Sequence, residues 1–246
     1  MLLIQNGSLF DGSGADPVHG DILIDSGRIV RIGRIDPPRD CQVIDASGFA
    51  VAPGFIDLHS HSDLQVLQEQ RREKVLQGVT TEVVGNCGFS PFPQGEHPRE
   101  LCEFGGGILG QQDGWGWRGA REYLDAVAGR AVVLVGHGSL RVAVAGLHQG
   151  PLGAAELDRV AALLDDSLGA GCAGFSTGLM YAPGSSAGRD ELLRLCAIVA
   201  RHGKLYATHM RSYASGLVDA VREATRPGAL DRLSFADLAP AGRGAR

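Results

Sequence analysis

The sequence predicts an α/β fold in which parallel strands alternate with helices. From residue 54 onward, short apolar runs alternate with helical segments of about a dozen residues, which is the pattern of βα units in series. The apolar runs are continuous rather than alternating, as expected for strands that helices cover on both faces. Polar or glycine-rich motifs follow the runs, where α/β proteins build their sites. These observations predict a parallel sheet with right-handed crossovers, either a barrel or a doubly wound sheet.

The individual elements follow from apolar runs and amphipathic stripes. The expected strands cover residues 55–58, 79–84, 131–135, 172–176 and 205–209. The expected helices cover residues 64–77, 120–128, 154–168, 190–200 and 216–224. The stretch 88–118, which contains three consecutive glycines at 105–107, is expected to be irregular. A loop of that length is usually functional or a lid.

Residues 1–53 predict a small β structure of their own. The runs 21–25 and 28–33 flank a Ser-Gly turn, which is a hairpin pattern. Such a sheet is too small to bury both faces, so we expect it to need strands from elsewhere in the chain. The chain is therefore expected to divide at residues 1–53, 54–226 and 227–246, the last being a divergent tail.

Composition excludes several classes of function. The chain has 246 residues and a formal net charge of −5, without a basic patch that would indicate nucleic acid as a partner. No apolar run approaches the roughly 20 residues of a membrane helix, and the N-terminus does not have the pattern of a signal peptide. The five cysteines are odd in number and widely spaced, which favours reduced thiols in a cytoplasm.

Candidate metal ligands follow the predicted strands. His59 and His61 follow the first strand with one residue between them, so we expect both imidazoles to point the same way. Cys87 follows the second strand and His209 ends the fifth. Taken singly, Cys87 could be a small buried apolar residue and His209 a core histidine. Because strand ends converge at the mouth of a barrel, the four together predict a zinc site.

The other histidines have different expected roles. His137 lies between two glycines, and we interpret it as shaping its turn or contacting substrate rather than binding metal. The four remaining histidines are interpreted as surface or loop residues: His19, His97, His148 and His202.

Five motifs give the chain a specific resemblance. PGFIDLHSH at 53–61 resembles the opening motif of the amidohydrolase superfamily. The motifs that resemble its N-acyl-D-amino-acid deacylase (D-aminoacylase) branch are GNCGFSP at 85–91, GHGSLR at 136–141, GFSTGLMY at 174–181 and THMR at 208–211. The resemblance covers about residues 1–226 and implies a metal-dependent-hydrolase (β/α)8 barrel, with about five βα units present, plus part of a small β-sandwich.

The resemblance also implies roles for individual residues. His59 and His61 would serve one metal position, Cys87 would be the cysteine ligand of the tighter zinc, and His209 the ligand from strand five. A second zinc ion would be held more weakly. Tyr181 matches a tyrosine that contacts the substrate carboxylate. The implied activity is hydrolysis of the amide bond of N-acyl-D-amino acids, small molecules whose acyl carbonyl zinc polarises.

The lysine count supports Cys87 as the anionic ligand. Many amidohydrolases bridge two metals with a carbamylated lysine after strand four. Only Lys74 and Lys204 are lysines here. Lys74 falls in the first expected helix and Lys204 precedes strand five, so neither is placed to bridge metals.

The tail departs from the family pattern. The resemblance implies a further histidine ligand after strand six and a general-base aspartate after strand eight, both beyond this chain, so no catalytic residue is assigned. Residues 227–246 do not look like strand six, and we interpret them as a frameshift or truncation. Strands one and five are then expected to be open edges. Two alternatives to a deacylase stay open: a non-catalytic remnant that binds zinc, and a cyclic-amide hydrolase of the same superfamily.

Overall fold

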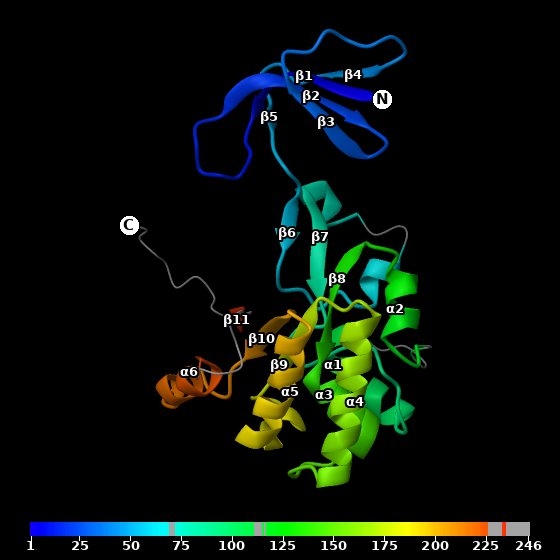
Figure 1. Cartoon of the computed structure of the whole chain (residues 1–246), viewed down its shortest axis with the longest axis vertical. Coiled ribbons are helices and arrows are strands. Elements are labelled where there is room, and N and C mark those ends of the chain that lie inside the picture. Colours follow the sequence, from blue (N-terminus) through cyan, green and yellow to red (C-terminus); the bar gives the residue numbers. More distant parts are fainter. Residues whose placement is uncertain (69–71, 111–114, 116, 226–232, 235–246) are drawn as a thin grey trace. The chain divides into compact units, whose positions relative to one another are not determined.

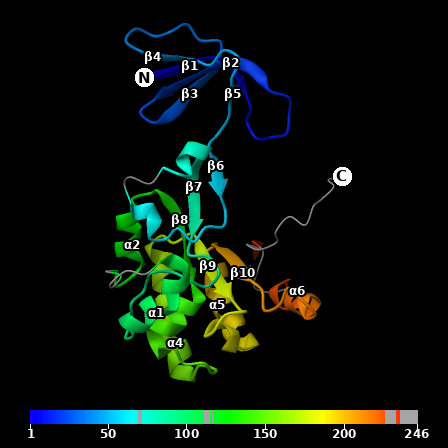
Figure 2. The same ribbon diagram turned by 180° about the vertical axis from the view of Figure 1, so that it is seen from behind.

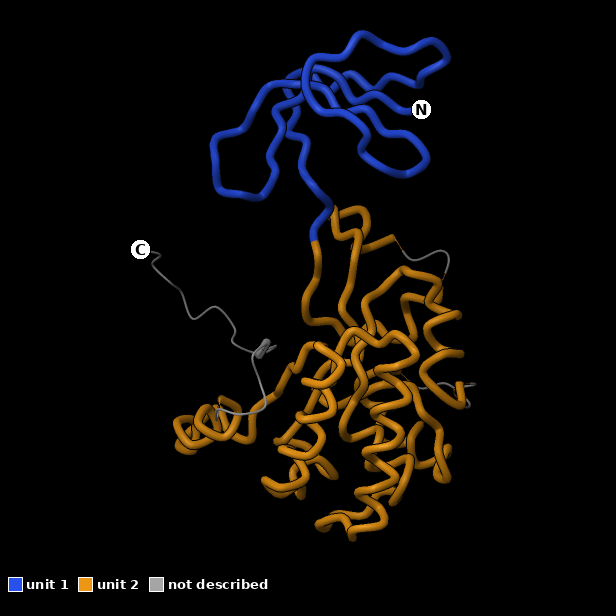
Figure 3. Tube along the Cα trace, viewed as in Figure 1, with its two compact units in different colours: residues 1–55 blue, residues 56–246 orange. Residues whose placement is uncertain are grey.

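The computed structural model describes residues 1–68, 72–110, 115, 117–225 and 233–234. It divides into two compact units, Met1–Phe55 and Ile56–Arg246, which are drawn in different colours in Figure 3.

The first unit is a mixed five-stranded sheet. Its strands are β1 (Leu2–Leu9), β2 (Val18–Asp25), β3 (Arg28–Gly33), β4 (Gln42–Asp45) and β5 (Ala50–Val51). The order is β3-β2-β1-β4, with β5 also paired to β1. β2 and β3 form the expected antiparallel hairpin. The buried carboxylate of Asp21 accepts hydrogen bonds from the backbone amides of Asn6 and Ile35, which ties the sheet to the segment after β3.

The second unit contains a sheet whose strands follow the order of the chain (Figures 1 and 2). The strands are β6 (Phe55–Asp57), β7 (Val79–Val84), β8 (Ala131–Gly136), β9 (Gly174–Gly178), β10 (Leu205–His209) and β11 (Leu233–Ser234). All neighbouring pairs from β7 to β11 are parallel. The α/β prediction is confirmed. The unbroken strand order favours a partial (β/α) barrel, because the order reverses in a doubly wound sheet.

Helices connect the strands and cover the sheet. They are α1 (Pro98–Leu109), α2 (Ala120–Val127), α3 (His137–Ala145), α4 (Ala154–Ala170), α5 (Arg189–Arg201) and α6 (Leu217–Thr225), with short 3-10 turns η1 (Gln65–Leu67), η2 (Val75–Gln77) and η3 (Gly184–Ser186). The main apolar core joins strand residues such as Val135 and Phe175 to Leu164 of α4 and Leu195 of α5. Burial of this core fixes the strands whose ends carry the candidate site.

Two expectations for the connecting segments are wrong. The described residues between 64 and 77 form η1 and η2 rather than one helix. The stretch 88–118 contains α1, which includes the three glycines. A Cβ atom on Gly105 would lie 2.2 Å from Cη2 of Trp115, so the glycine makes room for a buried indole ring instead of breaking the helix.

The expectation for the tail is corrected in one place. Leu233–Ser234 forms β11, in which Leu233 lies opposite Tyr206 of β10. β10 is therefore paired on its outer side at Tyr206 and Ala207, where the prediction had an open edge. The other residues of 227–246 lie outside the described part of the chain. Among the described residues, no helix combines the length and the apolar composition that crossing a membrane requires.

Candidate metal centre

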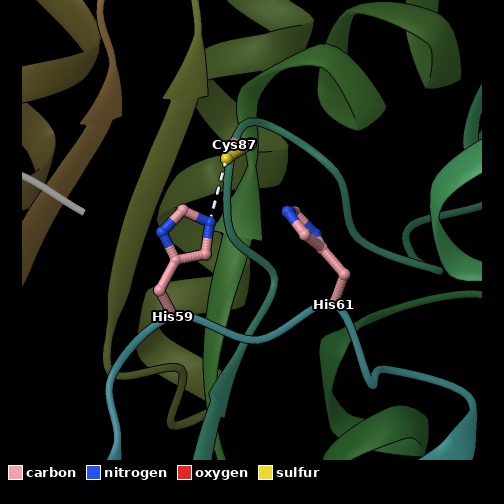
Figure 4. Close-up of side chains that lie close together, drawn as sticks. All are labelled: His59, His61 and Cys87. Carbon is pink, nitrogen blue, oxygen red and sulfur yellow. Dashed lines mark hydrogen bonds between the residues drawn. The ribbon is translucent and has the colours of Figure 1, made fainter. Parts of the chain in front are cut away.

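Three of the four predicted ligands form one group at the ends of β6 and β7. The ligand atoms of His59, His61 and Cys87 all lie within 4.8 Å of one another. Nε2 of His59 is 3.2 Å from Sγ of Cys87, as drawn in Figure 4. β6 ends at Asp57, so both histidines lie in the bend after the strand and not on the strand itself, which corrects the expected placement.

His209 brings the fourth predicted ligand to the same place. It is the last residue of β10, and its Nδ1 is 3.7 Å from Sγ of Cys87. The hydroxyl of Tyr181 lies 3.1 Å from the same Nδ1, and the rings of Tyr181 and Tyr213 both pack beside the imidazole. The structure therefore brings His59, from the end of β6, and His209, from the end of β10, to the thiol of Cys87 after β7.

A tight turn after β7 presents Cys87. Its backbone adopts a left-handed conformation with φ of 54°. A Cβ on Gly85 would meet the backbone oxygen of Leu134 at 2.0 Å, so only glycine fits there. The buried Asn86 side chain donates to the backbone oxygen of Ser60, 3.4 Å away. Through this bond the cysteine turn is joined to the residue between the two histidines.

The donor set fits zinc. Thiolate and imidazole are preferred zinc ligands, and two such atoms on one tetrahedral ion are about 3.6 Å apart, given bond lengths of about 2.3 and 2.1 Å. The separation of 3.2 Å between Cys87 and His59 is close to that value. Nδ1 of His61 is buried and has no hydrogen-bond partner in the described part of the chain. A metal bound at this atom would satisfy it.

Asp63 is a buried carboxyl near the candidate ligands in the chain that the sequence analysis did not single out. It is fully buried two residues after His61, and burial raises the pKa of its carboxyl to about 7, although the charge on His61 opposes this. Both carboxylate oxygens are buried. Its position beside a candidate ligand was the only sequence feature that could have drawn attention to it.

His137 lies in a different group. It begins α3 and is fully buried, with Nε2 2.8 Å from Oε1 of Glu191. The same carboxylate pairs with Arg141 at 2.6 Å. Burial lowers the pKa of His137, while hydrogen bonds from His137 and Arg141 outweigh burial and lower the pKa of Glu191. Contact of His137 with substrate stays a prediction.

Comparison with known protein families shows to which family this chain belongs. A family model described as "Amidohydrolase family" matches residues 42–232. The chain belongs to the amidohydrolase family. The metal-type group found above lies within the matched residues, and the resemblance seen in the sequence motifs is confirmed.

The amidohydrolase is similar to curated deacylases. It is 39% identical over 233 residues to the N-acyl-D-aspartate deacylase of Alcaligenes xylosoxydans xylosoxydans, covering 90% of this chain and 45% of that protein. It is 34% identical to the D-aminoacylase of the same organism, covering 92% of this chain and 48% of that protein. The chain thus spans about half the length of the curated relatives that it matches.

A solved structure extends the likeness to the fold. The N-acyl-D-glutamate deacylase from Bordetella bronchiseptica was crystallised with zinc and a phosphonate inhibitor that mimics the tetrahedral intermediate. It superimposes with a TM-score of 0.78 at 38% identity, over 90% of this amidohydrolase and 47% of that chain. This likeness confirms the partial barrel.

Proposed function

We propose that this chain forms part of a zinc-dependent deacylase that hydrolyses the amide bond of N-acyl-D-amino acids. The observation that carries the proposal is the convergence of His59, His61, Cys87 and His209 at strand ends. The identity to named deacylases supports this substrate class over cyclic amides. The five free cysteines fit the cytoplasm expected from the sequence.

The chain's own residues would hold one zinc ion tightly. Cys87 would be the anionic ligand, because Lys74 is engaged with Asp57 and Glu82, and Lys204 precedes β10. The imidazoles would complete the set. When bound, zinc polarises the acyl carbonyl and lowers the pKa of water towards about 7.

Tyr181 would orient the substrate. Its hydroxyl lies beside His209 at the edge of the metal-type group, where it can donate a hydrogen bond to the substrate carboxylate. Phe89 packs against Tyr181 with ring centroids 5.6 Å apart and holds the phenol in place. The products would be a carboxylic acid and a D-amino acid.

A second function has its own supporting observation. The chain spans about half of its curated relatives, and we assign no proton-transfer carboxylate within it. A chain of this kind can bind zinc without turning over substrate. Residues 54–226 would then form a partial barrel that binds zinc but does not catalyse hydrolysis.

Zinc content and turnover, measured together, test both proposals. The 246-residue chain is assayed for zinc per chain and for release of D-methionine from N-acetyl-D-methionine, with N-acetyl-L-methionine and a His59→Ala variant as controls. Zinc binding with preference for the D substrate supports the deacylase. Zinc binding without turnover supports the second function. A chain that retains no more zinc than the His59→Ala variant contradicts both.

A further inference from the structure

A charged cluster lies beside the two histidines and outside the residues assigned to the metal. It consists of Asp57, Ser60, Lys74 and Glu82. We propose that Lys74 is a positioning residue: its ammonium group, held by Asp57, Ser60 and Glu82, fixes the bend that carries His59 and His61 in the geometry that binds zinc. This inference rests on the proposed metal site.

The ammonium group of Lys74 joins three parts of the chain. Nζ lies 2.6 Å from Oδ2 of Asp57, at the end of β6. It lies 2.9 Å from Oγ of Ser60, in the bend, and it also pairs with the carboxylate of Glu82 in β7. The three donors of the ammonium match these three acceptors. One residue therefore links β6, the bend and β7.

Ser60 transmits this link to the histidines, because it is the residue between them. Its side chain is buried, and its Oγ is 2.8 Å from Oε2 of Glu82 and 2.7 Å from Oγ of Ser62. The backbone amide of Ser62 donates to the same Oγ at 3.1 Å, and the amide of Ser60 donates to Val83. The backbone on both sides of Ser60 is thereby fixed.

Asp57 makes the same connection from the other side. Its Oδ2 binds Lys74, while its Oδ1 accepts a hydrogen bond from the backbone amide of His59 at 3.2 Å. One carboxylate thus couples the lysine to the main chain of a candidate ligand. Loss of the ammonium would remove the hydrogen bonds that join Asp57, Ser60 and Glu82, and the bend would then be held less firmly.

The residue type at this position supports a geometric role. The chain has 23 lysines and arginines, and only Lys74 and Lys204 are lysines. A guanidinium group is a planar fork that suits one carboxylate, whereas an ammonium is a compact charge with three donors. The position where three separate acceptors converge holds one of the two lysines. Although burial opposes it, hydrogen bonds to Asp57 and Glu82 raise the pKa of Lys74, which keeps the ammonium charged.

The alternative is that the cluster stabilises the fold without affecting the metal. The two roles predict different results for two measurements: the free energy of unfolding without metal, and the zinc affinity of the folded chain. A purely structural residue changes the free energy of unfolding in chelator but leaves the zinc affinity of the folded chain unchanged. A positioning residue weakens zinc binding in chains that are folded.

The experiment compares the two lysines in the full 246-residue chain. Lys74→Met and Lys74→Arg are set beside the matched Lys204→Met and Lys204→Arg variants. Zinc affinity is measured by competition with a chelator, the visible spectrum of the cobalt-loaded chain reports ligand geometry, and urea unfolding in chelator reports stability. We expect Lys74→Met and Lys74→Arg to weaken zinc binding by about 10- to 100-fold, as loss of an outer partner of a metal ligand does.

The variants separate failure of this inference from failure of the proposed metal site. Unchanged zinc affinity in Lys74→Arg overturns the positioning role, and this variant keeps the charge if Lys74→Met does not fold. Equal weakening in the Lys204 variants also overturns it, because the effect would then not depend on the cluster. If the unsubstituted chain binds no zinc, the proposed metal site fails and this inference fails with it.

Discussion

Two groups of histidines lie at strand ends, and they differ in the partners of the acidic side chain that each group contains. His137 follows β8 and bonds to Glu191, which also pairs with the guanidinium of Arg141. His59 follows β6 and His209 ends β10, and both lie beside the thiol of Cys87. In the first group an arginine supplies the positive charge next to the anion. In the second group two imidazoles lie beside the thiol, and the ligand atoms of His59, His61 and Cys87 lie within 4.8 Å of one another.

The comparison shows why ligand-type residues at strand ends do not all belong to one site. A carboxylate bound by both histidine and arginine is already satisfied, and a metal ion would have to displace the arginine. A thiol surrounded by imidazoles gains most from a divalent cation. The partner of the anion, rather than the presence of histidine, distinguishes the structural group from the candidate metal centre.

The largest expected effect comes from breaking the buried carboxylate group. Glu191→Gln leaves Arg141 buried without its anion, so the free energy of unfolding should fall by about 3–5 kcal/mol. Urea denaturation in chelator measures this, and zinc affinity of the folded chain should not change. Asp158→Asn is the matched control, because its pair with Arg194 is exposed and worth about 0–1 kcal/mol.

The same variant has a pH dependence of known sign. The pKa of Glu191 is lowered from its usual value of 4.5, so its contribution to stability is present above that pH and is lost as the pH falls through the folded-state pKa. The difference between Glu191→Gln and the unsubstituted chain should shrink in acid. A difference that grows below pH 4.5 would contradict the assigned ion pair.

Removal of the thiol should have the largest effect on metal binding. Zinc binding of about 10–16 kcal/mol shared among four ligands averages about 3 kcal/mol each, so Cys87→Ala should weaken zinc by about 100-fold. Competition with a chelator measures the loss. Cys102→Ala, at a partly exposed cysteine of α1, should bind zinc like the unsubstituted chain. Equal affinity in both variants would remove Cys87 from the site.

A smaller effect is expected at the hydroxyl beside His209. Tyr181→Phe removes a neutral hydrogen bond to His209 that is worth about 0.5–1.5 kcal/mol. Zinc affinity should therefore fall by about 2- to 10-fold. Tyr213→Phe is the comparison variant, since its ring also contacts His209 but its hydroxyl accepts from the amide of Met210. A larger loss in Tyr213→Phe than in Tyr181→Phe would contradict the assignment.

The last prediction needs no substitution. Burial raises the pKa of the Cys172 and Cys196 thiols to about 12, so both stay protonated at pH 8 and resist alkylation. Cys41 and Cys102 are partly exposed and should react first. Peptide mass spectrometry with and without zinc should show protection of Cys87 alone. Alkylation of Cys172 before Cys41 would contradict the described burial.

The sheet was predictable because its strands are strongly marked. The runs at 79–84 and 205–209 form β7 and β10 with the expected bounds, since a glycine or lysine precedes each and polar motifs follow. α1 was not predictable from local preference. Glycine disfavours helices, but a Cβ at position 105 would collide with the buried indole of Trp115, a contact that no local pattern shows.

The candidate site likewise has features that the sequence pattern predicts and features that depend on contacts between distant parts of the chain. Strand-end position was enough to predict that His59, Cys87 and His209 lie together, because parallel strands bring their carboxyl ends to one edge. Lys74 was expected in a helix, and its contacts with Asp57 and Glu82 were not predicted. Its partners Asp57 and Glu82 come within reach only after β6 and β7 pair, which no local pattern encodes.

The placement of Cys87 has a consequence for chain entropy. Its sulfur faces His59, 28 positions away in the chain, and His209, 122 positions away. An ion held by all three would act as a cross-link that closes a long loop of the unfolded chain. By analogy with a disulfide closing a loop of about 100 residues, such a link is worth about 4–5 kcal/mol. An ion at the candidate metal centre would therefore also hold the first and fifth βα units of the partial barrel together.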